Sequence, residues 1–265
     1  MSDPTLLPTF AVAGRSASHT TITATMMKKQ YRDIFLDFDD TLYDTYGNAV
    51  IALAETFDAF RLGRYFDEPQ VFYDAYWQAN IELWGQYSRG EITRDYLITE
   101  RFRRPLMVSE RFSNTYQHPT LLSKEISDRF LDFCSCKTGV VDGAHELMDY
   151  LSSQGYHIHM CSNGFHEVQY KKLQACGLRP FFNTVILSED AGANKPSERF
   201  FDYALSQTGA SRETTVMIGD NLQTDIMGAK AAGIDTIFFN RDPDSEKSDE
   251  PTHTVTSLLQ IKDIL

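Results

Sequence analysis

The stretch YRDIFLDFDDTLYD, residues 31–44, carries the strongest information about the fold. Its first part, residues 31–38, is a short apolar and aromatic run that ends in acids, which is typical of a buried strand. Asp37, Asp39 and Asp40 stand where this strand closes. The stretch therefore predicts a buried strand that presents carboxylates at its carboxyl end.

The periodicity of the sequence changes after this strand. Residues 45–139 show helical spacing and almost no strand pattern, and Ala49, Leu53 and Phe57 share one helical face. From residue 140 onward helices and strands alternate, and a glycine follows directly after four helices, as left-handed helix ends prefer. We expect helices over 143–154, 165–176, 197–208 and 222–232, and strands over 157–163, 184–187, 215–220 and 234–239.

This alternation predicts the fold class. Strands separated by helices of about 10–14 residues form right-handed βαβ units and a parallel sheet. We expect an α/β fold with a doubly wound, Rossmann-like parallel sheet as a core domain, built from residues 29–44 and 140–265. Residues 45–139 would form an inserted α-helical cap domain, and residues 1–28, which lack apolar periodicity, a disordered N-terminal extension.

Composition restricts the class of partner. The 265 residues include 37 acids and 25 Lys and Arg, a net charge of −12, which argues against a broad surface for a nucleic acid polymer. A small phosphate ester stays possible, because one metal ion and one lysine can reverse the field locally. No run of about 18 apolar residues predicts a membrane span. Four cysteines in a chain of this size form no disulfide scaffold, so we expect reduced thiols in the cytoplasm. We expect a monomer or a homodimer.

Reactive side chains stand at the ends of several predicted strands. Ser162 and Asn163 close the second strand, Asp220 closes the strand that begins at residue 215, and Lys195 precedes a helix. Asp225 follows Asp220 by about one turn. Ligands of open α/β sheets bind at the carboxyl ends of the strands, and converging carboxylates need a cation, for which Mg²⁺ with oxygen ligands is the natural choice. The set predicts a phosphoryl-transfer site.

Four ordered motifs carry a family resemblance: DFDDTLYD at 37–44, SNG at 162–164, NKP at 194–196 and GDNLQTD at 219–225. They resemble the motifs of the haloacid dehalogenase-like (HAD) phosphatase superfamily, including the position of its cap between the first and second motifs. Within it, the stretches YWQANIELWGQYSRGEITRDYLITERF and CSNGFHEVQYKKLQACGLRPFF are similar to YjjG-like noncanonical pyrimidine nucleotidases.

The resemblance implies a role for each motif residue. Asp37 would be the nucleophile that forms an aspartyl-phosphate, and Asp39 would protonate the leaving alcohol and later activate water. Thr41 would orient the loop and help to bind the phosphate. The Ser162 hydroxyl and the Asn163 backbone N–H would hold phosphoryl oxygens.

The same resemblance implies a metal site. Mg²⁺ would be bound by the Asp37 carboxylate, the Asp39 backbone carbonyl and Asp220. Lys195 would neutralise charge between nucleophile and phosphoryl group, and Asp225 would act from outside the ligand set, through a metal-bound water or by positioning Lys195. Asp220 is also a candidate N-cap for the helix over 222–232.

The expected function is a Mg²⁺-dependent phosphomonoester hydrolase acting on a small phosphorylated metabolite, with nucleoside 5′-monophosphates, pyrimidines above all, as the implied substrates. Aromatic side chains near the first motif, among them Tyr43 and Tyr46, are candidates for stacking a base. Alternatives are a sugar-phosphate or cofactor phosphatase, a phosphoglucomutase-type phosphotransferase, a 2-haloacid dehalogenase and an inactive binding protein. Dehalogenation needs no metal and no leaving-group acid, so Asp39, Asp220 and Asp225 favour phosphate chemistry.

Overall fold

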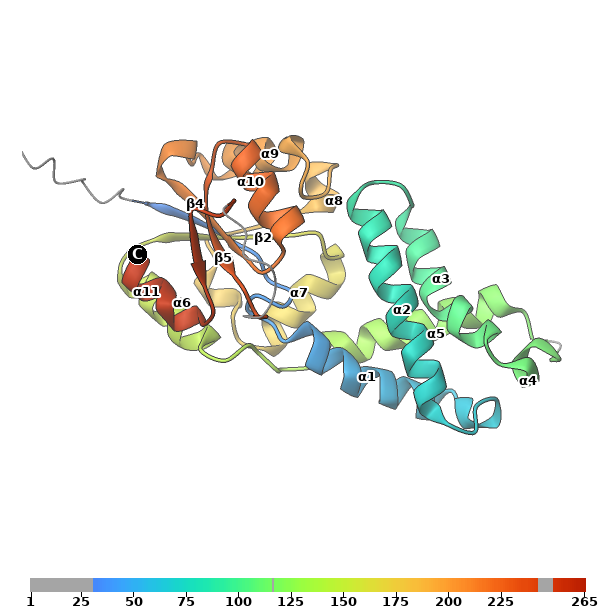
Figure 1. The fold of residues 1–265 in the computed structure, drawn as a ribbon. Helices are drawn as coiled ribbons and strands as arrows, with labels where there is room; N and C mark the ends of the chain where they lie inside the picture. The colour runs from blue at the N-terminus through green and yellow to red at the C-terminus, as the bar shows by residue number, and fades with distance from the viewer. Residues whose placement is uncertain (1–30, 116, 243–249) are drawn as a thin grey trace, which may run out of the picture.

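The computed structural model describes residues 31–115, 117–242 and 250–265, and the extension expected at 1–28 lies outside them. The described residues contain a six-stranded parallel sheet in the order β3-β2-β1-β4-β5-β6 (Figure 1). The predicted fold class, a doubly wound α/β sheet, is confirmed. The strands are β1 Asp33–Leu36, β2 His157–Ser162, β3 Thr184–Leu187, β4 Thr215–Gly219, β5 Asp235–Phe239 and β6 His253–Val255.

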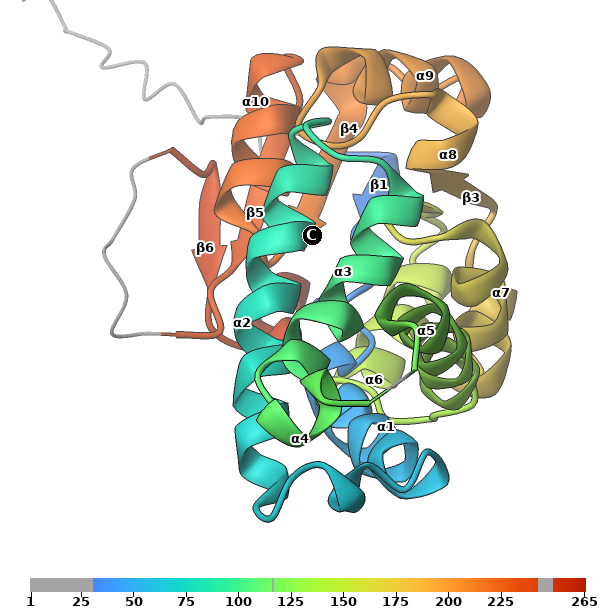
Figure 2. The same ribbon diagram turned by 90° about the vertical axis from the view of Figure 1, so that its right-hand side faces the viewer.

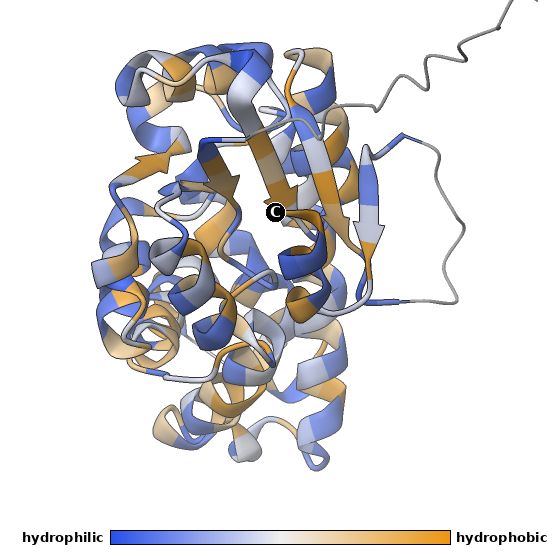
Figure 3. Ribbon diagram, turned by 90° about the vertical axis from the view of Figure 1, so that its left-hand side faces the viewer, coloured by the Kyte–Doolittle hydropathy of each residue, from blue (hydrophilic) through white to orange (hydrophobic). Residues whose placement is uncertain are grey.

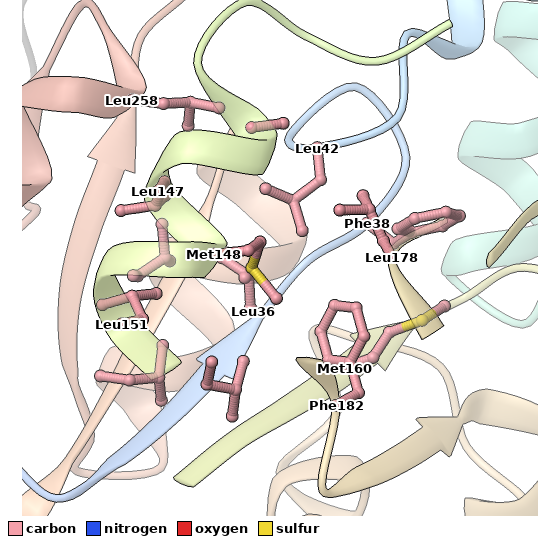
Figure 4. Packing of buried hydrophobic residues seen from close by; sticks show 14 of the residues in the cluster. Leu36, Phe38, Leu42, Leu147, Met148, Leu151, Met160, Leu178, Phe182 and Leu258 are labelled. Atoms are coloured by element: carbon pink, nitrogen blue, oxygen red, sulfur yellow. The ribbon is translucent and has the colours of Figure 1, made fainter. Parts of the chain in front are cut away.

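Both faces of the sheet are buried. Successive side chains of β1 point to opposite faces, and each face packs in an apolar cluster of its own. Ile34 and Leu36 pack in one cluster with Met148 of α6, whereas Phe35 packs in the other with Phe200 of α9 (Figure 4 shows the first cluster). Coloured by hydropathy, the central strands are largely apolar, as Figure 3 shows. The helices of this part are α6 Ala144–Ser153, α7 His166–Ala175, α8 Ser188–Ala191, α9 Glu198–Thr208, α10 Gly228–Ala231 and α11 Ile261–Ile264.

Five α-helices lie between β1 and α6 in the chain and beside the sheet in space (Figures 1 and 2). We call them the cap helices. They share an apolar cluster of their own, in which Ala49, Leu53 and Phe57 are buried on one face of α1, as predicted. The domain limits at 44/45 and 139/140 stay a prediction. The cap helices are α1 Thr45–Ala59, α2 Pro69–Ser88, α3 Arg94–Met107, α4 Glu110–Ser113 and α5 Pro119–Ser135.

The chain leaves β1 for the cap helices and returns from them at adjacent points. Tyr43 and Val140 form an isolated antiparallel bridge. The backbone N–H of Val141 donates to the carbonyl of Leu42 at 2.8 Å, and the Asn48 side chain donates to the Gly139 carbonyl at 2.8 Å. The two connections therefore form one hydrogen-bonded unit.

The structure corrects one predicted helix. The segment expected over 222–232 begins as a π-helix, η4 Leu222–Met227, and only then continues as α10. Its N-cap is Asn221, whose side chain accepts hydrogen bonds from the backbone of Gln223 and Thr224, so the proposed capping role of Asp220 was wrong. The remaining short helices are the 3-10 segments η1 Leu62–Arg64, η2 Arg179–Phe181, η3 Arg212–Thr214 and η5 Leu258–Gln260.

The expected glycine helix ends are confirmed. The glycines placed just after four helices all have positive φ: Gly155, Gly177, Gly209 and Gly233. All four cysteines are free thiols. Across the ranges that the structure describes, no helix combines the length and the apolar character needed to cross a bilayer.

Candidate active site

The predicted site residues meet at the carboxyl edge of the sheet, where a cavity of about 690 Å³ extends to the cap helices. That size suits a metabolite. Thr41 lies behind the cavity wall, fully buried and hydrogen-bonded to two of the lining acids. The predicted residues that line the cavity are Asp37, Asp39, Ser162, Asn163, Lys195, Asp220 and Asp225.

Lys195 is buried and makes three contacts with its ammonium group. Nζ donates to Asp37 Oδ1 at 2.6 Å, to Asp225 Oδ1 at 2.7 Å and to the Cys161 carbonyl at 2.7 Å, which uses every proton that an ammonium has. Burial alone would lower the pKa of Lys195, but Asp225 and Asp37 outweigh it and raise that pKa above its ordinary value. The lysine therefore stays charged between two carboxylates.

Thr41 links the first and the fourth motif. Its hydroxyl lies 3.1 Å from Asp37 Oδ2 and 2.9 Å from Asp220 Oδ1, and it accepts a hydrogen bond from the Asp220 backbone N–H at 3.1 Å. Because β1 and β4 are adjacent parallel strands, both acids leave the sheet at the same level. Thr41 fixes their spacing.

Three carboxylates form a group that suits a hard cation. One oxygen each of Asp37, Asp220 and Asp225 lie within 4.8 Å of one another. Burial raises the pKa of Asp37, although Lys195 opposes the shift. Burial, with the nearby carboxylates of Asp225 and Asp40, raises the pKa of Asp220 to about 7. The three carboxylates repel one another and offer only oxygen atoms as ligands, which fits a hard cation such as Mg²⁺.

The Asp39 side chain is held by residues that the sequence did not single out. Lys172 Nζ donates to Asp39 Oδ1 at 2.6 Å, Thr45 Oγ1 donates to the same oxygen at 2.8 Å, and Gln169 Nε2 donates to Oδ2. Burial would raise the pKa of Asp39, but Lys172 and these hydrogen bonds lower it below its ordinary value. The only signal in the sequence was a Gln and a Lys three residues apart on the buried face of α7.

The second motif is fixed by side-chain hydrogen bonds. Ser162 Oγ accepts from the Gly164 backbone at 3.0 Å and from Gln169 Nε2 at 2.7 Å. The Asn163 amide is tied to the third motif, because it accepts from the Lys195 backbone N–H at 2.8 Å and donates to the Lys195 carbonyl at 3.0 Å. Asn163 thus orients the loop that carries Lys195.

Aromatic residues of the cap helices form part of the cavity wall. The rings of Tyr46 and Trp77 lie 4.8 Å apart, and Trp84 stacks on Phe165 of the sheet side at 5.3 Å. Tyr43 also lines the cavity, but its hydroxyl donates to the Cys134 carbonyl. Tyr46 and the two tryptophans therefore give the cavity its aromatic character.

Gly219→Ala should disable the site, because a Cβ at residue 219 would lie 2.3 Å from Asp225 Oδ2. Asp225 is buried and hydrogen-bonded to Lys195, so its side chain can move away from the added Cβ only by breaking that hydrogen bond. We expect a loss of about 1–3 kcal/mol in unfolding free energy, together with a large loss of turnover. Thermal unfolding and enzyme assays check this. Gly63→Ala, whose Cβ would meet only Phe57 at 3.8 Å, is the control, and equal behaviour of the two variants would contradict the prediction.

Comparisons with known proteins agree with this geometry. The profile of the haloacid dehalogenase-like hydrolases matches residues 31–233. The HAD-hydrolase YfnB of Bacillus subtilis is 31% identical over 89% of this chain and 96% of its own length. The pyrimidine 5′-nucleotidases PynA of Streptococcus pneumoniae and YjjG of Escherichia coli are 30% and 31% identical, over 89% and 88% of this chain and 95% and 96% of their own.

A solved structure extends the likeness to three dimensions. The crystal structure of YfnB, described as bound to magnesium and as revealing interdomain movement, superposes with a TM-score of 0.76 at 29% identity, covering 89% of this chain and 99% of YfnB. The expected superfamily and hydrolase class are confirmed. With the family profile covering the cap helices and the strands from β1 to β4, the chain belongs to the haloacid dehalogenase-like hydrolase family.

Proposed function

We propose that the chain is a Mg²⁺-dependent phosphomonoester hydrolase that dephosphorylates nucleoside 5′-monophosphates, with a preference for pyrimidines, through an aspartyl-phosphate. The observation that carries the proposal is the buried contact of 2.6 Å between Lys195 Nζ and Asp37, beside the acids that include Asp220. Phosphoryl transfer needs such a nucleophile with positive charge close to it. The names of PynA and YjjG support the choice of substrate.

The reaction has two half-reactions. In the first, an Asp37 oxygen attacks phosphorus, the bond from phosphorus to the leaving oxygen breaks, and Asp39 gives that oxygen a proton. In the second, water attacks phosphorus, Asp39 takes the proton of the water, and the bond between Asp37 and phosphorus breaks to release phosphate. One group acts as acid and then as base, and Lys172 and Gln169 hold it in place.

The other residues bind and orient. The Ser162 hydroxyl and the Asn163 backbone N–H would hold phosphoryl oxygens, and the Lys195 ammonium would neutralise charge between Asp37 and the phosphoryl group. Asp37, Asp220 and the backbone carbonyl of Asp39 would bind Mg²⁺, which supplies charge neutralisation for the phosphoryl group. Asp225 keeps Lys195 in position through their contact of 2.7 Å. Retention of Asp39 and Asp220 supports phosphate chemistry over dehalogenation.

Phosphate release tests the proposal across UMP, dUMP, dTMP, purine nucleotides and hexose phosphates, each with Mg²⁺ and with EDTA. We expect Mg²⁺-dependent release that is fastest for the pyrimidine nucleotides. If dUMP, dTMP and UMP are hydrolysed no faster than hexose phosphates, the pyrimidine preference is wrong while the phosphatase assignment stands. Release that is unchanged in EDTA would contradict the metal requirement.

Magnesium binding should depend on pH, because the proton on Asp220 competes with the ion. In metal-free protein, the folded state holds this proton up to about pH 7 and the unfolded chain only up to about pH 4. The unfolding free energy therefore falls as pH rises from about 4 to about 7. Affinity for Mg²⁺ should rise about tenfold per pH unit over the upper part of this window.

Thermal unfolding between pH 5.5 and 8.5, with Mg²⁺ or EDTA, measures both effects. The stabilisation by Mg²⁺ should be small at pH 5.5 and should level off above about pH 7. In Asp220→Asn the part of the pH dependence that comes from the Asp220 proton should disappear, and Mg²⁺ should bind more weakly because one of its proposed ligands is lost. An equal shift by Mg²⁺ at pH 5.5 and 8.5 in the unaltered protein would contradict the prediction.

A further inference from the structure

Arg101 of α3 is a buried cation in the wall of the cavity that also contains Asp37 and Lys195. Only 2% of the residue is exposed. Of the described residues, its guanidinium donates only to Ser127 Oγ, from Nε at 3.3 Å and from Nη2 at 2.9 Å. Among the residues that the structure describes, no carboxylate lies within ion-pair distance of Arg101.

The other basic residues nearby are all paired. Lys172 and Lys195, the other two basic residues in the cavity wall, contact carboxylates at 2.6 Å. On the same helix, Arg94, Arg103 and Arg104 form ion pairs with glutamates. Within the described part of the chain, Arg101 therefore differs from the two buried lysines in having no carboxylate within ion-pair distance. It differs from the other arginines of α3 in being buried as well.

Such an arrangement is unfavourable unless a ligand completes it. A guanidinium removed from water loses its hydration, and the rings of Phe130 and Phe102, 5.3 and 5.6 Å from the Arg101 Cζ, replace only part of it. The serine hydroxyl accepts both of the hydrogen bonds described for Arg101. Donor capacity is thus left over at the wall of a cavity that receives the substrate.

We propose that Arg101 determines specificity by donating hydrogen bonds to a carbonyl oxygen on the base of the leaving nucleoside. The proposal rests on the nucleotidase function argued above. A guanidinium has donors and no acceptor, so it selects an oxygen acceptor. The aromatic wall at Tyr46 and Trp77 suits a planar ring that carries one.

Charge favours a neutral carbonyl over a carboxylate at this position. The cavity wall contains five aspartates and three basic residues, so a leaving group with its own negative charge would add to the repulsion. A pyrimidine base offers carbonyl oxygens without such a charge. Arg101 acts on the leaving group, away from the phosphoryl transfer itself.

The test compares Arg101→Met with Arg103→Met, a surface variant on the same helix, on three substrates with Mg²⁺. UMP carries the base, ribose 5-phosphate lacks it, and p-nitrophenyl phosphate reports the phosphoryl chemistry alone. In Arg101→Met we expect kcat/KM for UMP to fall about 10–100-fold, mainly through KM. The other two substrates should change less than about threefold, and Arg103→Met should resemble the unaltered protein on all three.

Stability separates binding from a structural role. The metal-free Arg101→Met protein should unfold at the same temperature as the unaltered protein or higher, because replacing an unpaired buried charge by an apolar side chain removes a desolvation penalty. Arg101→Lys, which keeps the charge but not the forked geometry, should lose part of the UMP preference. A lower unfolding temperature together with equal losses on all three substrates would overturn the proposal.

The remaining outcomes are also decisive. An Arg101→Met enzyme that keeps its preference for UMP over ribose 5-phosphate contradicts the role of Arg101 and leaves the nucleotidase function intact. A loss confined to a carboxylate-bearing substrate such as phosphoserine overturns the assignment to a base carbonyl. If the unaltered protein hydrolyses p-nitrophenyl phosphate but not UMP, the nucleotidase function fails, and the proposal fails with it.

Discussion

Asp37→Asn is expected to abolish formation of the phosphoryl-enzyme and to lower kcat by about 10⁴-fold or more. The amide retains the size of the carboxylate but lacks the negative oxygen that attacks phosphorus. It also removes one of the charges that hold Lys195. Trapping with labelled substrate and acid quench measures the covalent intermediate, and phosphate release measures turnover.

Two further variants sharpen that experiment. Asp39→Asn should form phosphoryl-enzyme slowly, if at all, because the leaving-group acid is lost while the nucleophile remains. Asp149→Asn makes the same chemical change at an exposed position of α6 and should have normal kinetics. Normal turnover by Asp37→Asn would refute the assignment of the nucleophile.

Lys195→Met should damage both stability and activity. The variant leaves the buried carboxylates of Asp37 and Asp225 facing each other without the cation that now lies 2.6 and 2.7 Å from them. Loss of one partner of a buried ion pair costs about 3–5 kcal/mol. Without the lysine, the carboxylates of Asp37 and Asp225 repel each other, and binding a proton removes this repulsion. The already raised pKa of Asp37 should therefore rise further.

This protonation gives the variant a characteristic pH dependence. A carboxyl whose folded pKa lies above its unfolded value stabilises the folded state at low pH, and that contribution is lost as pH rises towards the folded pKa. Lys195→Met should therefore be less impaired at pH 5 than at pH 8 in denaturant unfolding. Lys171→Met, which removes an exposed lysine from α7, is the control. Equal stability of Lys195→Met and the unaltered protein would contradict the prediction.

The sheet and the positions of the motif residues followed from local patterns. Buried apolar runs identified the strands, and the ends of those strands placed Asp37, Ser162 and Asp220 at one edge of the sheet. The glycines after four helices were equally predictable, because a left-handed helix end needs a residue without Cβ. The three-residue strand β6 was missed, since it is too short to show periodicity.

Side chains that act through distant contacts were not predictable in the same way. Lys172 lies 133 positions from Asp39, and in the sequence it looks like any lysine of an amphipathic helix. Asp220 looked like a helix cap, but Asn221 takes that role, since its side chain accepts hydrogen bonds from the backbone of Gln223 and Thr224. Arg101 is one of three arginines in the run RFRR, and only the packing of α3 distinguishes it from Arg103 and Arg104.

The hydrogen-bonded junction at Tyr43 and Val140 bears on how the inserted segment could be exchanged, in the laboratory or in evolution. Because the outgoing and returning segments of the insertion are adjacent, an insertion of another length can be exchanged there at a loop-closure cost that grows only slowly with its length. A graft made between Asp44 and Gly139 would keep every acid of the catalytic edge and replace the wall that we propose contacts the leaving group. Substrate range can thus be changed separately from the bond-breaking chemistry when the grafted segment keeps a hydroxyl at the position of Thr45, which holds Asp39.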